Sequence, residues 1–171
     1  DDNRIFNEVI RFGGKVAMTT NTHQSGTDRC AEVINNINEI YDVVINIQGD
    51  EPFINPMQIK QLCNCFNDPK TQIATLVKKI SKTDELFNEN KVKAVLNNNQ
   101  FALYFSRNPI PYFRGEPKEN WLNKHTYFKH IGIYGYQTPI LKEITQLSPS
   151  SLELTEGLEQ LRWLENGFNI K

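Results

Sequence analysis

The chain has 171 residues, of which 39% are hydrophobic and 23% charged, and its formal net charge is −1. This length suits one domain with its own core, and the composition is that of a globular protein. With a net charge so close to zero, the chain as a whole has no excess of basic residues. We therefore expect neither nucleic acid nor an anionic membrane as a partner.

Two further features of the composition bear on the compartment. No apolar run is long enough to cross a bilayer, and the first residues do not follow the pattern of a signal peptide. The three cysteines are an odd number without zinc-site spacing, so we expect free thiols in a reducing compartment. Together these features predict a cytoplasmic protein.

In the first half of the chain, hydrophobic spacing predicts helices in alternation with strands. The run at 43–47 is nearly all apolar, which is typical of a strand covered on both faces in a parallel sheet. Pro56 suits the first position of a helix, where no amide hydrogen is needed. The predicted elements are helices over 3–12, 28–40 and 56–66 and strands over 15–19, 43–47 and 73–80.

The second half adds a hairpin, with strands over 91–96 and 101–106 around a turn at 97–100. Residues 107–128 are predicted to be a long loop, and a loop of that length in a compact domain usually has a function. A strand over 130–136 and helices over 139–147 and 152–165 complete the pattern.

These elements predict an α/β fold in a single domain over residues 1–171. We expect a mostly parallel, Rossmann-like sheet with helices on both faces and an inserted antiparallel hairpin. Such a domain normally opens with a buried strand and a phosphate-binding loop, whereas this chain opens on a polar helix and closes as a strand at 169–171 begins. We therefore expect the domain to continue beyond both ends.

The turn after the strand at 43–47 contains adjacent carboxylates in Gln-Gly-Asp-Glu-Pro at 48–52. In open α/β sheets, ligands bind at the carboxyl ends of strands. A carboxylate there suits Mg²⁺, which is held by one or two carboxylates together with phosphate oxygens and water. Asp50 is thus a candidate metal ligand, and the alternative is that Asp50 and Glu51 cap the next turn.

Two other segments place polar groups at the ends of elements. Residues 23–29, His-Gln-Ser-Gly-Thr-Asp-Arg, precede a helix, whose first amides can receive polar ligand atoms. The alternative there is an ordinary N-cap, with Thr27 or Asp28 capping the helix and Arg29 solvated. Arg107 ends a strand before a Pro-x-Pro turn, and its guanidinium can bind a carboxylate through two hydrogen bonds. The alternative is an arginine exposed to solvent.

The strand at 130–136 alternates, so His130, Gly132, Tyr134 and Tyr136 are expected on one face. Its glycines allow close approach of a ligand, although an edge strand with aromatic packing is an equally simple interpretation.

The helix at 152–165 is expected to bury one stripe and to present a polar face, which is either a binding surface or only solvated. The buried stripe is predicted to be Leu154, Leu158 and Leu161, and the polar face Glu156, Glu159 and Gln160.

Taken in order and with their spacing, these segments resemble the CMP-Kdo synthetases over nearly the whole chain. The segments that carry the resemblance are 23–29, 48–52, 102–107, 131–136 and 158–162. The resemblance implies a cytidylyltransferase that joins CTP and 3-deoxy-manno-octulosonate (Kdo) to give CMP-Kdo and pyrophosphate for lipopolysaccharide synthesis. It also implies Mg²⁺ as cofactor and a homodimer, with the hairpin at 91–106 as part of its interface.

The resemblance assigns a role to each matching residue. Asp50 is implied to bind magnesium and, with Arg107, to be catalytic, while Arg107 is also implied to pair with the sugar carboxylate. The nucleotide site is implied to be Ser25, Gly26, Thr27 and Arg29. The sugar site is implied to be Gln48, Arg107, His130, Tyr134, Glu159 and Gln160.

This assignment predicts a geometry: the acidic turn after the strand at 43–47, Arg107 and the polar face of the last helix should open into one crevice. Because the phosphate-binding segment is expected outside this sequence, we expect the 171-residue chain alone to be poorly active. Two rivals stay open, a related nucleotidyltransferase for another sugar acid such as sialic acid or for a sugar phosphate, and a non-catalytic binding domain of the same fold.

Overall fold

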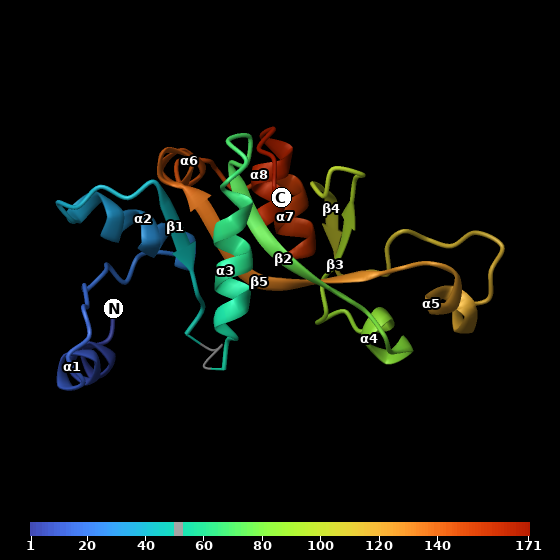
Figure 1. Ribbon diagram of the computed structural model, residues 1–171, viewed down its shortest axis with the longest axis horizontal. Coiled ribbons are helices and arrows are strands. Elements are labelled where there is room, and N and C mark those ends of the chain that lie inside the picture. Colours follow the sequence, from blue (N-terminus) through green and yellow to red (C-terminus); the bar gives the residue numbers. More distant parts are fainter. Residues whose placement is uncertain (50–52) are drawn as a thin grey trace.

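The structure is a computed structural model that describes residues 1–49 and 53–171, and it is an α/β fold (Figure 1). Its helices and strands follow in the order α1 (Asn3–Arg11), α2 (Gly26–Asn36), β1 (Val43–Asn46), α3 (Pro56–Cys65), β2 (Ile73–Lys79), α4 (Thr83–Phe87), β3 (Lys93–Leu96), β4 (Ala102–Ser106), the 3-10 helix η1 (Lys118–Asn120), α5 (Trp121–Lys124), β5 (Phe128–Gln137), α6 (Thr138–Ile144), α7 (Ser151–Glu156) and α8 (Gln160–Glu165).

The sheet is organised around β5, which runs through the middle of the molecule (Figure 1). One edge of β5 pairs with β2 along most of its length, from Ile73↔Tyr136 to Lys79↔Phe128. The other edge pairs with β1 near the end of β5 and with β3 near its beginning. Strand β4 pairs with β3 and so completes the predicted hairpin.

The expectation of a mostly parallel sheet is wrong. Every pairing between these strands is antiparallel among the described residues, and the parallel contact is an isolated bridge between Ile73 and Ile170. Strands β1 and β2 do run in the same direction, but β5 lies between them. The apolar run in β1 reflects cover on both faces, which the structure confirms, and this burial does not fix the direction of the neighbouring strand.

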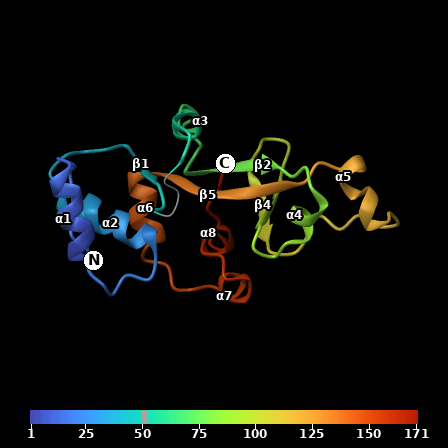
Figure 2. The same ribbon diagram turned by 90° about the horizontal axis from the view of Figure 1, so that it is seen from below.

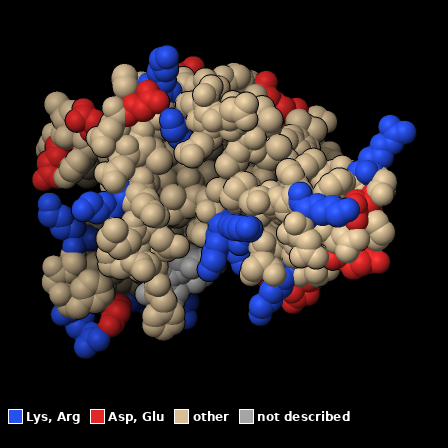
Figure 3. All heavy atoms as spheres, turned by 45° about the vertical axis from the view of Figure 1, so that its right-hand side comes forward, with Lys and Arg blue, Asp and Glu red and all other residues tan. Residues whose placement is uncertain are grey.

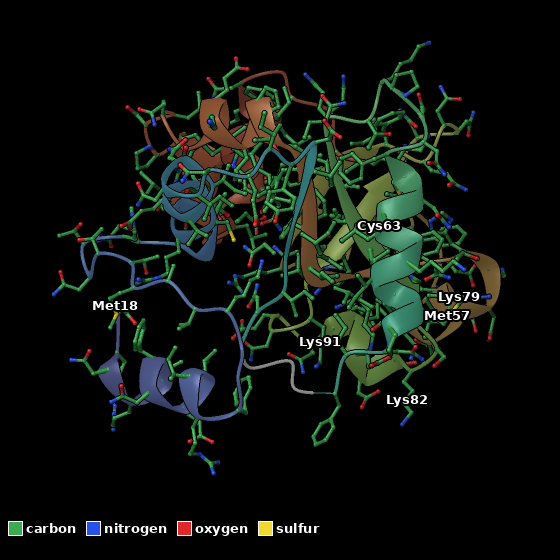
Figure 4. The ribbon with its side chains drawn as sticks, turned by 60° about the vertical axis from the view of Figure 1, so that its left-hand side comes forward. Met18, Met57, Cys63, Lys79, Lys82 and Lys91 are labelled. Carbon is green, nitrogen blue, oxygen red and sulfur yellow. The ribbon has the colours of Figure 1, made fainter. Side chains whose placement is uncertain are left out.

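Helices cover both faces of the sheet, as predicted (Figure 2). Leu62 of α3 packs with Ala74 and Ile133 on one face. On the other face Tyr136 belongs to a larger core with residues from α2, α6 and α8, including Ala31, Leu141, Leu161 and Trp163. On the outward side of α3 lie Met57 and Cys63 (Figure 4), and all three cysteines are free thiols, as expected.

The helix predicted at 3–12 forms as α1, but none of its residues is fully buried, and Ile5 is 64% and the C-cap Phe12 68% exposed. No strand forms over 15–19 within the described part of the chain. The helix predicted over 28–40 begins earlier, at Gly26, and ends at Asn36, because the backbone of Ile37 is already extended. The spacing of apolar residues therefore predicted the bounds and burial of these elements less accurately than those of the strands at the centre of the sheet.

The segment at 107–128 is more ordered than a loop. It contains η1 and α5, and Trp121 and Tyr127 form a small second core with Ile80 and Leu86. The Trp121 indole nitrogen donates to the carbonyl of Glu116 at 2.9 Å. This segment and α4, which the sequence did not predict, therefore stabilise one another.

The single helix predicted over 152–165 is two helices. Gly157 adopts a left-handed conformation with φ of 63° and ends α7, and its amide donates to the carbonyl of Glu153. The break turns the chain, so that Leu158 and Leu161 are buried while Leu154 is 72% exposed, contrary to the predicted stripe. Gln160 is also only 5% exposed, so it does not share the solvated face predicted for it.

We predict that Gly157→Ala lowers the free energy of unfolding by about 1 kcal/mol, because an L-residue in this conformation is strained. A steric clash does not contribute to this loss, because an added Cβ would lie 3.6 Å from the Arg107 side chain, which is an ordinary contact. Urea denaturation measures the loss, and Thr155→Ala within α7 is the matched control that should cause none. Unchanged stability together with a stronger helical signal would mean that α7 and α8 can join.

Candidate functional site

A hollow of about 520 Å³ opens where α2, β1, β5 and the start of α8 meet, and we call it the Glu159 hollow. It brings together residues that the sequence assigned to the nucleotide and residues that it assigned to the sugar. Its lining residues are Gly26, Thr27, Arg29, Cys30, Asn46, Ile47, Gln48, Gly49, Tyr134 and Glu159.

The N-terminus of α2 forms one wall of the Glu159 hollow. Ser25 is the N-cap, and its hydroxyl accepts the amide of Asp28 at 3.1 Å, so the helix is capped by Ser25 and not by Thr27 or Asp28. At Gly26 an added Cβ would lie 3.3 Å from the Asn46 side chain, which leaves little room for a larger residue. Arg29 donates to the Thr19 hydroxyl at 2.8 Å and so ties the preceding segment to α2.

Glu159 is a half-buried carboxylate in the hollow, beside the N-terminus of α2. Its Oε2 accepts a hydrogen bond from the hydroxyl of Thr27 at 2.9 Å, and that hydroxyl also lies 3.3 Å from the hydroxyl of Tyr136. Burial raises the pKa of the Glu159 carboxyl, while the hydrogen bond from Thr27 opposes this rise. An ionised carboxylate here is an acceptor for ligand hydroxyl groups.

A second hollow of about 460 Å³, the His130 hollow, adjoins the first and shares Ile47 and Gln48 with it. Gln48 donates to the carbonyl of Gly132 at 3.0 Å, and an added Cβ at Gly132 would lie 3.2 Å from the Gln48 amide nitrogen. The space beside Gly132 is thus taken by the Gln48 side chain, and the predicted close approach of a ligand stays a prediction. The residues that line this hollow are Ile47, Gln48, Ile54, Gln58, Lys78, Asn90, Lys91, Val92, Lys129, His130, Ile131, Gly132 and Ile133.

His130 and Tyr134 connect the two hollows through the core of β5. The His130 ring lies 2.9 Å from the Thr75 hydroxyl, and its centroid is 5.2 Å from that of Tyr134. Burial lowers the pKa of His130 to about 4, so the imidazole is neutral at physiological pH. Tyr134, in turn, packs edge-on against Trp163 with 5.1 Å between ring centroids.

Arg107 has a different environment from the one predicted. Its guanidinium donates to the backbone carbonyls of Glu156 at 2.6 Å and Gly157 at 3.3 Å, at the end of α7, and to that of Glu89 at 3.3 Å, after α4. These contacts turn the side chain towards α7, so the structure does not bring Arg107 into the crevice with Gln48 and Glu159. Arg107 is half-buried, and its contacts join the end of β4 to α7 and to the residues after α4.

Sequence reasoning missed two residues that hold Arg107 in place. The Lys93 side chain is fully buried, and its ammonium donates to the carbonyls of Asn88 and Arg107. The Glu156 carboxylate accepts from the Arg107 amide at 2.9 Å and from the Ser106 hydroxyl at 2.7 Å. In the predicted strand over 91–96 both Lys91 and Lys93 are charged, so the sequence alone did not single out Lys93.

Asp50, the predicted metal ligand, lies outside the described residues, as do Glu51 and Pro52. Within residues 1–49 and 53–171, no group of three or more His, Cys, Asp or Glu side chains is placed to hold a metal ion. The described residues therefore do not form a metal site by themselves.

Comparison with known proteins gives the family. A family model described as Cytidylyltransferase matches residues 1–170 of the chain. The chain belongs to the cytidylyltransferase family. It is 58% identical to a 3-deoxy-manno-octulosonate cytidylyltransferase of Parabacteroides distasonis and 59% identical to one of Bacteroides thetaiotaomicron, and each match covers 100% of this chain and 70% of the relative.

A solved structure supports the same assignment. The CMP:2-keto-3-deoxy-manno-octonic acid synthetase complexed with CTP has a TM-score of 0.90 to this chain at 44% sequence identity, and the match covers 100% of this chain and 68% of that one. The resemblance inferred from the sequence motifs is thus confirmed, and so is the α/β class of the fold.

The charges of this cytidylyltransferase are distributed unevenly between the two hollows. The described lining of the His130 hollow includes Lys78, Lys91 (labelled in Figure 4) and Lys129, whereas the Glu159 hollow contains Arg29 and Glu159. On the face shown in Figure 3, positive and negative side chains are interspersed. Among the described residues, no helix is both long and apolar enough to span a lipid bilayer.

We predict that the stability of the cytidylyltransferase falls as the pH decreases from 6.5 towards 4. The pKa of His130 is about 4 when folded and about 6.5 when unfolded, so the unfolded chain binds more protons in this window. The contribution is therefore fully present above pH 6.5, and at most about 3 kcal/mol is lost by pH 4. His130→Gln should flatten this part of a urea-denaturation pH series.

His125→Gln is the matched control, because His125 is exposed. It should leave the slope between pH 6.5 and 4 unchanged. A slope that persists in His130→Gln would assign the effect to other groups.

Proposed function

We propose that this chain forms the substrate-binding core of an enzyme that transfers CMP from CTP to Kdo and releases pyrophosphate. The observation that carries the proposal is the meeting, in the Glu159 hollow, of the N-terminus of α2 with Gln48, Tyr134 and Glu159. Relatives with this activity in their names are similar to the chain over its whole length.

The geometry supports a division of the site between the two substrates. Ser25, Gly26 and Arg29 lie at one wall, where amides at the start of α2 can receive polar groups of the nucleotide. Gln48 and Glu159 offer an amide and a carboxylate to the hydroxyl groups of the sugar. The neutral ring of His130 adds a hydrogen-bonding group at the adjoining hollow.

In the reaction that we propose, the anomeric hydroxyl of the sugar attacks the α-phosphorus of CTP. A new bond forms between the sugar oxygen and the α-phosphorus, and the bond between the α-phosphorus and the oxygen that bridges to the β-phosphorus breaks. The hydroxyl proton is released together with pyrophosphate. The described residues contribute by holding the two substrates next to each other, which converts a bimolecular step into a nearly unimolecular one. No covalent intermediate with the protein is required.

The assay that tests the function is release of pyrophosphate from CTP by the full-length protein with a panel of acceptors. We expect turnover with Kdo and little with sialic acid or a sugar phosphate. Binding of CTP without release of pyrophosphate with any acceptor would identify a binding domain, and faster turnover of another acceptor would replace Kdo as the substrate.

We also propose Mg²⁺ as the cofactor, with Asp50 as a ligand. The support is its place in the sequence, directly after Gly49, which lines the Glu159 hollow. When bound, the ion screens the negative charge of the phosphates. Because Asp50 lies outside the described residues, the magnesium site stays a prediction from the sequence.

We predict that Asp50→Asn raises the Mg²⁺ concentration needed for half-maximal activity at least tenfold, because a neutral amide is a weaker ligand than a carboxylate. Titration of activity with MgCl₂ measures this change. Asp42→Asn, which replaces an exposed aspartate before β1, is the control and should not alter the titration. An unchanged titration in Asp50→Asn would exclude Asp50 as a ligand.

The homodimer and the cytoplasmic location implied by the family are part of the proposal. The support for the hairpin as part of an interface is Leu103 of β4, an apolar side chain that is 59% exposed. Sedimentation velocity of the full-length protein measures the oligomeric state, and a monomer at micromolar concentration would contradict the dimer.

A further inference from the structure

The hydroxyl of Thr27 is engaged inside the protein. Thr27 is 2% exposed, and its Oγ1 donates to Glu159 Oε2 at 2.9 Å and lies 3.3 Å from the hydroxyl of Tyr136. Residues 27 and 159 are far apart in the sequence, and they lie in the first turn of α2 and directly before α8. One buried hydroxyl therefore joins the helix assigned to the nucleotide to the carboxylate assigned to the sugar.

The surroundings of Glu159 make this hydrogen bond important for the carboxylate. Burial favours the neutral acid, while the Thr27 hydroxyl favours the ionised form. Of the other groups, Ser25 and Arg162 also favour ionisation, and Asp28 opposes it. The remaining titratable groups around Glu159 are Arg29, Cys30, Tyr134 and Tyr136.

We propose that Thr27 is a positioning residue for the sugar acid, whose hydroxyl fixes the Glu159 carboxylate in the orientation that receives the sugar hydroxyl groups. The proposal rests on the proposed function for the identity of the ligand. It assigns Thr27 to the sugar, in place of the nucleotide contact that the family resemblance implies for this position.

The chemistry of the hydrogen bond between Thr27 and Glu159 supports the assignment of Thr27 to the sugar. A carboxylate that is ionised can only accept hydrogen bonds, so the Thr27 hydroxyl must donate to it. The Ser25 side chain is a further hydrogen-bond partner of Glu159, and an ionised carboxylate has acceptor sites beyond these two for a hydroxyl group of the ligand. Without the Thr27 donor the side chain loses a charge-assisted hydrogen bond and becomes easier to protonate, and a protonated acid is a poorer acceptor.

Thr27→Val tests the proposal, because valine has the shape of threonine without the hydroxyl group. In the full-length protein we expect the KM for Kdo to rise about tenfold, as for loss of one hydrogen bond to a charged group, and the KM for CTP to change less than twofold. The acidic limb of the kcat/KM profile for Kdo should move to higher pH. Thr27→Ser keeps a hydroxyl and should restore both parameters.

The chain offers a matched control in Thr71. This threonine is fully buried, and its Oγ1 has no hydrogen-bond partner among the described residues. Thr71→Val therefore removes a buried hydroxyl of the same kind, and it should leave both KM values and the pH profile unchanged. Thermal unfolding of each variant separates a loss of folding from a loss of positioning.

Two outcomes would overturn the proposal. A rise in the KM for CTP as large as that for Kdo would make Thr27 a nucleotide contact, and wild-type values in Thr27→Val would make its hydroxyl dispensable.

A further readout does not depend on activity: carbon-13 NMR titration of Glu159, assigned with Glu159→Gln, should show a higher pKa in Thr27→Val. If the wild-type protein releases no pyrophosphate, the proposed function fails while this titration still tests the contact.

Discussion

The pairing of both edges of β5 is the constraint on which the rest of the structure depends. Strand β2 occupies one edge, and β1 and β3 share the other, so three strands are held in register by one ten-residue strand. The register shift between Thr75 and Leu76 lies beside the part of β5 that contains Gly132. Such irregularities bend a strand and redirect its side chains. At this irregularity the Gln48 amide donates to the carbonyl of Gly132, and Gln48 lines both hollows.

A second junction connects the hairpin to the last two helices. Lys93 is buried without a carboxylate in direct contact among the described residues, and desolvation lowers its pKa. Its ammonium is satisfied by two backbone carbonyls, one of which belongs to Arg107. Because the Arg107 guanidinium caps the end of α7, the position at which α8 begins is fixed relative to β4. Glu159 directly precedes α8, so this junction also sets where the carboxylate enters its hollow.

Local signals in the sequence predicted individual elements well and their arrangement less well. Pro56 and the turn at 97–100 act within a few residues, and both α3 and the hairpin form where they were expected. Whether a sheet is parallel depends on which strands are neighbours in it. The residues of β1 and β2 carry no signal that β5, which comes much later in the sequence, lies between them. Gly157 falls inside the helix predicted over 152–165, where a glycine is unfavourable, and it marks the break. The contacts of Arg107 depend on that break, which is why its environment was not predicted.

The distribution of charge places two kinds of binding group in neighbouring hollows. Glu159 is held by neutral hydroxyl groups and is an acceptor that favours ligand hydroxyls over anionic groups. Lysines border the adjoining His130 hollow, and there they favour anionic groups. Gln48 is neutral and lies where the hollows meet, so its amide can interact with either kind of group. Hydroxyl-binding and anion-binding groups are thus separated by one uncharged side chain, an arrangement that suits a ligand carrying both.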